Sequence, residues 1–154
     1  MKIVSGGQTG ADLGGLLAGK AAGLETGGWM PKGFLTEIGY KPDMEISFGV
    51  LEHISPKYPP RTYCNVRDSD GTIRFAVDFS SRGEICTFNA IKQYKKPYID
   101  VDINNLKPVT DIVNWLKENN IQTLNVSGNK ESTHPGMCEI VKNYLLEVIE
   151  NIHT

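Results

Sequence analysis

The sequence has few of the residues that build disulfide frameworks, metal centres or nucleophilic triads. Its 154 residues include three cysteines, which are far apart and in no C-x-x-C arrangement, so neither a disulfide framework nor a zinc site is indicated. It has three histidines and no Gly-x-Ser-x-Gly elbow, which gives a nucleophilic triad little support. We therefore expect a protein of the reducing cytoplasm, without a metal site.

The sequence also lacks a large excess of positive charge and long apolar runs. Its formal net charge is −2, which argues against an extensive nucleic-acid surface or a polybasic membrane patch. Glycines follow directly after Met1 to Val4, which leaves no room for the apolar region of a signal peptide, and no later run reaches membrane-spanning length. We expect neither nucleic acid nor a membrane as partner, whereas a small anionic ligand needs only local positive charge.

Apolar periodicity predicts an alternation of strands and helices. At 154 residues the chain fits a single domain over residues 1–154. Such an alternation favours an α/β fold with a mainly parallel sheet, residues 26–42 are expected to form a long loop, and residues 44–51 stay open between a strand and irregular structure. The predicted strands are 2–4, 72–79, 97–103 and 123–126, and the predicted helices begin after Asp12, near Pro56 to Pro60, at Glu84, at Pro108 and near Pro135.

Glycine is what the sequence has in excess, and it is concentrated near the start. Eleven of the sixteen glycines fall at or before Gly39, and three of them lie between Ser5 and Asp12, where the first strand meets the first helical pattern. The N-terminus of a helix presents unpaired N–H groups and the positive end of the helix dipole, so this loop suits a phosphate or another anion. The loop residues expected to bind it are Gly6, Gly7, Gln8, Thr9, Gly10 and Asp12.

Two further polar loops follow predicted strands, at Ser80 to Gly83 and at Ser127 to Thr133. The C-terminal ends of parallel strands lie along one edge of the sheet, and ligands bind in the crevice there. We therefore expect the three loops to converge. The cations best suited to reach a phosphate are Lys32, Arg61, Arg82 and Lys130.

A simpler interpretation of the first loop stays open. A tight turn between strand and helix needs glycine for its geometry alone, and an acid at Asp12 complements the helix dipole without any ligand. Under that interpretation the protein is an interaction subunit whose glycine loop is only structural.

Several segments together resemble the family of "putative molybdenum carriers", also called circularly permuted YpsA-like. They cover almost the whole chain, and the family belongs to the Rossmann-like superfamily that includes the LOG phosphoribohydrolases and DprA. The resemblance implies a Rossmann-like sheet with helices on both faces, a nucleotide-derived or pterin phosphate ligand, and assembly as a homo-oligomer. The matching segments are Ser5 to Asp12, Gly27 to Gly33 with Glu37, Arg61-Thr62, Asn65 to Thr72, Gly83 with Thr87, Lys96-Pro97, Leu124 to Ser132 and Pro135-Gly136.

Two departures from the family pattern concern charge. Where the family tends to have Gly-Thr-x-x-Thr, this chain has Gly83-Glu-Ile-Cys-Thr87, and Glu84 places an acid beside the expected anion site. Where the family often has Gly-Pro-Arg-x-Ser, this chain has Gly128-Asn-Lys-Glu-Ser132, so Lys130 replaces the two-pronged guanidinium of arginine. Thr87 occupies the position of the catalytic glutamate of the phosphoribohydrolases. A threonine cannot act as a carboxylate base, which disfavours hydrolysis by their mechanism.

The sequence thus favours a binding protein over an enzyme. We expect it to sense, carry or sequester a phosphate-bearing ligand, either a nucleotide of the ADP-ribose type or a pterin phosphate such as molybdenum cofactor. The alternative is a hydrolase of a nucleotide or phosphoribosyl bond with Asp12 or Glu84 as the acid–base group; no catalytic residue is otherwise indicated. Beyond the first loop and the four cations, the expected ligand-binding residues are Ser81, Gly83, Thr87, Gly128, Asn129 and Ser132.

Overall fold

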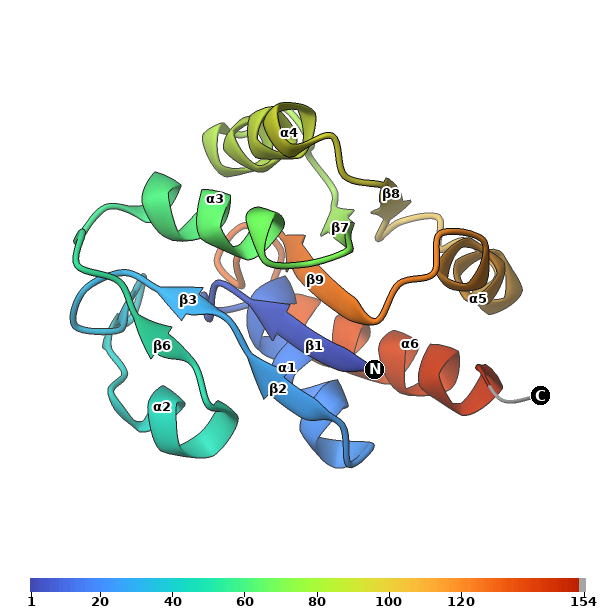
Figure 1. The fold of residues 1–154 in the computed structure, drawn as a ribbon, viewed down its shortest axis with the longest axis horizontal. Coiled ribbons are helices and arrows are strands. Elements are labelled where there is room, and N and C mark those ends of the chain that lie inside the picture. Colours follow the sequence, from blue (N-terminus) through green and yellow to red (C-terminus); the bar gives the residue numbers. More distant parts are fainter. Residues whose placement is uncertain (153–154) are drawn as a thin grey trace.

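A five-stranded parallel sheet forms the centre of the protein. The computed structural model describes residues 1–152 (Figure 1). The strands of this sheet are β1 (Lys2–Ser5), β2 (Glu25–Gly27), β7 (Gly71–Ala76), β8 (Tyr98–Asp102) and β9 (Thr123–Gly128). They are arranged in the order β2-β1-β9-β7-β8. Because all neighbouring pairs are parallel, the C-terminal ends of the strands share one edge.

Helices cover both faces of the sheet, which confirms the predicted α/β fold. One face carries α1 (Ala11–Ala21), α5 (Val109–Glu118) and α6 (Met137–Asn151), and the other carries α3 (Tyr58–Arg67) and α4 (Arg82–Tyr94) (Figure 1). The first helix and the last lie against each other, with Gly14 at the crossing: a Cβ there would lie 2.6 Å from a backbone oxygen of α6. In residues 1–152 no helix has the length and apolar character needed to cross a membrane.

The two faces of the sheet differ in polarity, and this difference positions the site. Successive side chains of a strand point to opposite faces. In β7, Ile73 and Phe75 join the main hydrophobic core with residues of α1, α5 and α6, whereas Thr72 and Arg74 make polar contacts instead. The apolar cluster between α3 and α4 is small. The layer beneath α3 and α4 is therefore largely polar.

Two segments between β1 and α3 are more regular than predicted. The expected loop at 26–42 contains the edge strand β2 and three strands of two residues each, and the segment at 44–51 contains a helix, which corrects the expectation of a strand or irregular structure. In that helix Met44 and Phe48, one turn apart, pack in a core cluster with Leu16 and Met30. The additional elements are β3 (Trp29–Met30), β4 (Leu35–Thr36), β5 (Gly39–Tyr40), α2 (Asp43–Phe48) and β6 (Leu51–Glu52). Strand β3 pairs with β6, and β4 with β5.

Candidate functional site

The loops after β1, β7 and β9 meet at Asn129. Its Oδ1 accepts hydrogen bonds from the N–H groups of Val77 at 2.8 Å and Asp78 at 3.4 Å, and its Nδ2 donates to the carbonyl of Asp78 at 3.2 Å. Its own backbone carbonyl accepts from the N–H of Ala11 at 3.1 Å. The structure therefore brings together the segments that follow these three strands, with the buried Asn129 as their common partner through its side chain and its backbone.

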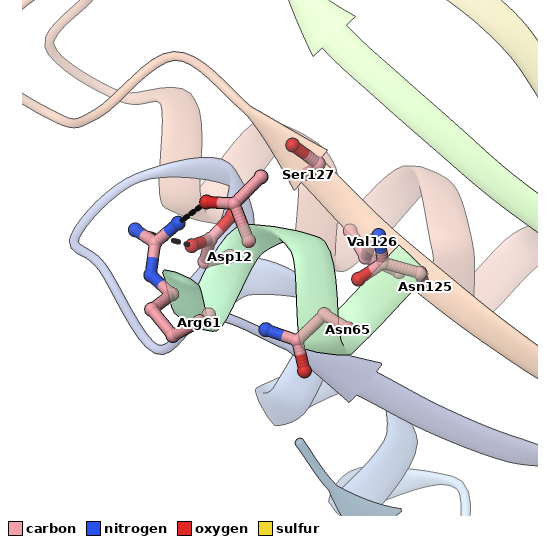
Figure 2. Close-up of a pocket in the computed structure, with 8 residues that line it drawn as sticks. Asp12, Arg61, Asn65, Asn125, Val126 and Ser127 are labelled. Carbon is pink, nitrogen blue, oxygen red and sulfur yellow. Dashed lines mark hydrogen bonds and ion pairs between the residues drawn. The ribbon is translucent and has the colours of Figure 1, made fainter. Parts of the chain in front are cut away.

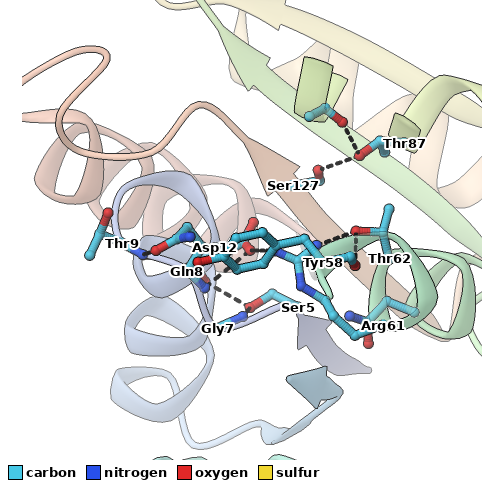
Figure 3. A network of polar contacts seen from close by, with 12 residues as sticks. Ser5, Gly7, Gln8, Thr9, Asp12, Tyr58, Arg61, Thr62, Thr87 and Ser127 are labelled. Atoms are coloured by element: carbon cyan, nitrogen blue, oxygen red, sulfur yellow. Dashed lines mark hydrogen bonds and ion pairs between the residues drawn. The ribbon is translucent and has the colours of Figure 1, made fainter. Parts of the chain in front are cut away.

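The glycine loop uses part of its hydrogen-bonding capacity internally. The N–H of Gly7 donates to Ser5 Oγ at 3.3 Å, that of Gln8 to Asp12 Oδ2 at 3.2 Å, and that of Thr9 to Gln8 Oε1 at 3.0 Å. Figure 3 shows these contacts around the start of α1. Three N–H groups of the loop are thus paired with acceptors of the loop itself, and Asp12 supplies one of these acceptors.

Glu37, at the tip of the β4–β5 hairpin, makes hydrogen bonds to the loops after β1 and β9. Its carboxylate accepts from Thr9 Oγ1 at 2.6 Å and from Ser132 Oγ at 2.5 Å, and it lies 3.9 Å from Lys130 Nζ. Although partial burial opposes it, the hydrogen bonds from Ser132 and Thr9 lower the pKa of Glu37. Three residues predicted to bind an external anion therefore contact an anion of the protein itself.

Arg61, in the first two turns of α3, lies directly over the glycine loop. Its side chain is 12% exposed, and its Nη2 lies 4.0 Å from Asp12 Oδ2, while Nη1 donates to Thr62 Oγ1. Within residues 1–152 its buried Nε has no hydrogen-bond partner. A Cβ on Gly6 would lie 2.7 Å from this Nε, so only glycine at that position lets the guanidinium approach the loop.

A small polar pocket lies beneath Arg61, between α3 and the strands β1 and β9. Its volume is about 10 Å³, which is room for roughly one water molecule. In Figure 2 Arg61 and Asp12 point toward each other at one end of the pocket, and Asn65 and Asn125 lie at the other. The lining residues are Gly6, Asp12, Arg61, Thr62, Asn65, Asn125, Val126 and Ser127.

Sequence reasoning missed four of these pocket residues as site candidates: Thr62, Asn65, Asn125 and Ser127. A signal for the last two was present, because Asn125 and Ser127 alternate with the apolar Leu124 and Val126 along one strand. Such alternation places polar side chains on one face of a strand. The signal from α3 was weaker, since its burial depends on how the helix lies on the sheet.

Glu84 and Arg74 are buried near this pocket but are not among the residues that line it. Glu84 is 3% exposed and its Oε1 has no hydrogen-bond partner in the described residues. Burial, with the charge of Asp12 added, raises the pKa of Glu84 to about 7. Arg74 makes two 2.7 Å hydrogen bonds to Asp100 and donates to the backbone carbonyl of Glu84 at 3.0 Å. Burial likewise raises the pKa of Asp12 to about 6, against the opposing charge of Arg61.

The other predicted cations do not converge on this pocket. Lys32 is exposed, Arg82 is exposed at the first residue of α4, and Lys130 is half exposed and paired with Glu37. Arg61 is thus the predicted cation that the structure buries at the sheet edge.

The remaining predicted residues of the second loop take structural positions near the pocket. Ser81 Oγ accepts from the N–H of Glu84 at 3.4 Å as the N-cap of α4. Thr87 Oγ1 donates to the carbonyl of Gly83 at 3.1 Å and lies 3.4 Å from Ser127 Oγ (Figure 3). In the third loop, a Cβ on Gly128 would lie 1.9 Å from the carbonyl oxygen of Phe75. Whether these residues touch a ligand stays a prediction.

A second, wider groove of about 550 Å³ lies on the outer side of the glycine loop. Both carboxylates of this groove have hydrogen-bond partners. Glu37 accepts from Thr9 and Ser132. Glu131 accepts from the N–H groups of Gly136 at 2.6 Å and Cys138 at 2.9 Å at the start of α6. In residues 1–152 no three His, Cys, Asp or Glu side chains are grouped as metal ligands.

Comparison with known proteins agrees with this architecture. The model of the circularly permutated YpsA SLOG family matches residues 3–149. A crystal structure of a "putative molybdenum carrier protein" from Syntrophus aciditrophicus SB is similar, with 34% sequence identity and a TM-score of 0.86. The match covers 96% of this chain and 92% of that one. Among curated proteins, none matches this chain.

Proposed function

Since the chain belongs to the circularly permuted YpsA SLOG family, we propose that it binds a small phosphate-bearing ligand at Arg61 and senses, carries or sequesters it. The observation that carries this proposal is the buried Arg61 guanidinium, whose Nε has no partner in the described residues. Guanidinium groups recognise phosphate through paired N–H donors. A phosphate oxygen is the partner that this N–H requires.

The surroundings of Arg61 support the same proposal. A buried donor left without a partner would cost about 1–3 kcal/mol, and this donor lies at the edge where parallel α/β sheets bind ligands. Glycine at position 6 lets the guanidinium lie directly against the loop, because a Cβ there would lie 2.7 Å from Arg61 Nε. The pocket of about 10 Å³ holds no more than a water molecule, so the Arg61 side chain shifts when a larger group enters.

Two ligand classes are consistent with these features. A nucleotide-derived ligand such as an ADP-ribose-type signalling nucleotide matches the glycine loop at a helix N-terminus. A pterin phosphate such as molybdenum cofactor is suggested by the name of the similar protein from Syntrophus aciditrophicus SB. We also keep homo-oligomeric assembly and a cytoplasmic location as parts of the proposal.

One observation favours a hydrolase as the second candidate. Asp12 and Glu84 are buried carboxyls with pKa values raised to about 6 and about 7, and a general acid or base works best when its pKa lies near the working pH. If a nucleotide incubated with the protein yields product, and Asp12→Asn abolishes turnover while binding persists, the enzyme interpretation replaces the binding one.

Calorimetric titration of the wild type and Arg61→Met tests the binding proposal. The probes are ribose 5-phosphate, AMP, ADP-ribose and a phosphorylated pterin. Loss of a charge-assisted hydrogen bond of about 1.5–3 kcal/mol weakens affinity roughly 10–100-fold. Arg67→Met is the matched control, because Arg67 is an exposed arginine of the same helix that pairs with Asp68. The proposal fails if no probe binds, or if both variants bind as the wild type does.

A further inference from the structure

Glu84 is a buried carboxyl group that forms no ion pair with any of residues 1–152. It lies in the first turn of α4 and is 3% exposed. Its Oε1 is buried and, within residues 1–152, makes no hydrogen bond. An ionised carboxylate in such a place is unfavourable, because burial removes much of its hydration and no hydrogen bond to Oε1 replaces it.

The nearest cations are committed to other carboxylates. The Arg74 guanidinium makes two hydrogen bonds to Asp100 and donates a third to the backbone carbonyl of Glu84. It also lies over the rings of Phe79, Phe88 and Tyr98. Arg61 faces Asp12 at 4.0 Å. The titratable and charged groups around Glu84 are therefore Asp12 on α1, Arg61 on α3, Arg74 on β7, Asp100 on β8 and the Cys86 thiol on α4 itself.

The charges of these groups make the binding of another anion unfavourable. With every carboxyl ionised, two arginines face three carboxylates, and a phosphate at Arg61 adds to the surplus. Charges interact strongly where water is excluded, so the surplus is removed most easily by protonating the carboxyl that has no partner. Burial and the charge of Asp12, which raise the pKa of Glu84 to about 7, act in the same direction.

We propose that the Arg61 pocket takes up an oxyanion only together with a proton held on Glu84. This inference rests on the proposed ligand site at Arg61 and adds its dependence on pH. The proton comes from solvent, and no covalent bond changes. When Glu84 is neutral the pocket accepts the anion; when Glu84 is ionised, a proton has to be bound first, so affinity falls as the pH rises.

Inorganic sulfate is the appropriate probe, because its charge is constant across the pH range and any linked proton therefore belongs to the protein. The dissociation constant is measured by calorimetric titration between about pH 5.5 and pH 8.5. For the wild type we expect it to be constant at the acid end and to rise about tenfold per pH unit at the alkaline end, which is the slope for one linked proton.

Three variants locate that proton. Glu84→Gln, which resembles the neutral acid in shape, is expected to bind sulfate with the same affinity at every pH. Asp12→Asn is expected to keep the slope. Glu118→Gln, a change of an exposed glutamate at the end of α5, is expected to behave as the wild type and controls for the substitution itself.

The outcomes separate this inference from the proposed function. If wild-type affinity is independent of pH while Arg61→Met still weakens binding, the ligand site stands and the proton linkage is wrong. If Glu84→Gln keeps the slope and Asp12→Asn loses it, the proton is not on Glu84. If neither sulfate nor any phosphate probe binds at about pH 6, both proposals fail.

Discussion

Replacing Glu84 by glutamine is expected to stabilise the folded protein at alkaline pH. The pKa of Glu84 rises from an ordinary value of 4.5 to about 7 on folding, chiefly through burial and then through the charge of Asp12. Each pH unit between the folded and unfolded pKa is worth about 1.36 kcal/mol. The ionised carboxylate therefore costs the folded state about 3 kcal/mol, and a neutral amide of the same shape avoids this cost.

The dependence on pH follows from which state binds the proton more tightly. Since the folded-state pKa is the higher one, the favourable contribution of the neutral acid is present below about pH 4.5 and is lost as the pH rises through about 7. Urea denaturation of both proteins is the assay. The free energy of unfolding of Glu84→Gln relative to the wild type is expected to increase by about 3 kcal/mol from pH 4 to pH 8.

A flat difference between the two proteins across this range would refute the reasoning. It would mean that Glu84 has a partner in solution that holds its charge, and the proton linkage inferred for the pocket would lose its physical basis. Glu118→Gln again serves as control, because an exposed carboxyl contributes little difference between the folded and unfolded states.

Three further changes test the structure around the loops. Asn129→Ala is expected to lower the free energy of unfolding by about 1–2 kcal/mol, since it leaves the partly buried N–H of Val77 without its acceptor; urea denaturation measures this. Gly10→Ala is expected to lower the melting temperature far more than Gly23→Ala, because φ is positive at both positions but only at Gly10 does a Cβ lie 2.4 Å from a backbone oxygen. Glu37→Gln is expected to speed amide hydrogen exchange in residues 35–40 without global unfolding, and unchanged exchange there would show that its contacts contribute nothing to the hairpin.

The central elements of the fold were predictable because their patterns are local. The strand predicted at residues 72–79, which the structure has at Gly71–Ala76, and the last helix follow periods of 2 and 3.6 residues, which depend only on which face is buried. The edge strand β2 was missed because its three residues, Glu25 to Gly27, carry no apolar alternation. The short helix α2 did carry a signal, since Met44 and Phe48 are four residues apart and both are buried.

The convergence of the three loops was also predictable, because parallel strands bring their C-terminal ends to one edge. What the loops contact was not. Glu37 is 28 residues from Thr9 in the sequence, and nothing in its neighbourhood indicates that its carboxylate holds Thr9, Lys130 and Ser132. A donor that suits an external phosphate suits an internal carboxylate equally well, so residue type alone cannot distinguish the two partners.

The choice among the four candidate cations depends on burial, which the loops themselves do not determine. Lys32, Arg82 and Lys130 lie in polar segments where a side chain can extend into water. Arg61 instead lies on a helix whose position over the sheet is set by its packing against α4 and β3, and that packing directs the guanidinium over Gly6. Polar residues of β9 lie at the same pocket beneath Arg61. Where a helix covers a strand that alternates polar and apolar side chains, the polar side chains become buried and need hydrogen-bond partners. A search of the sequence for such strands identifies the floor of the pocket, and the cation above it follows from whichever helix covers that floor.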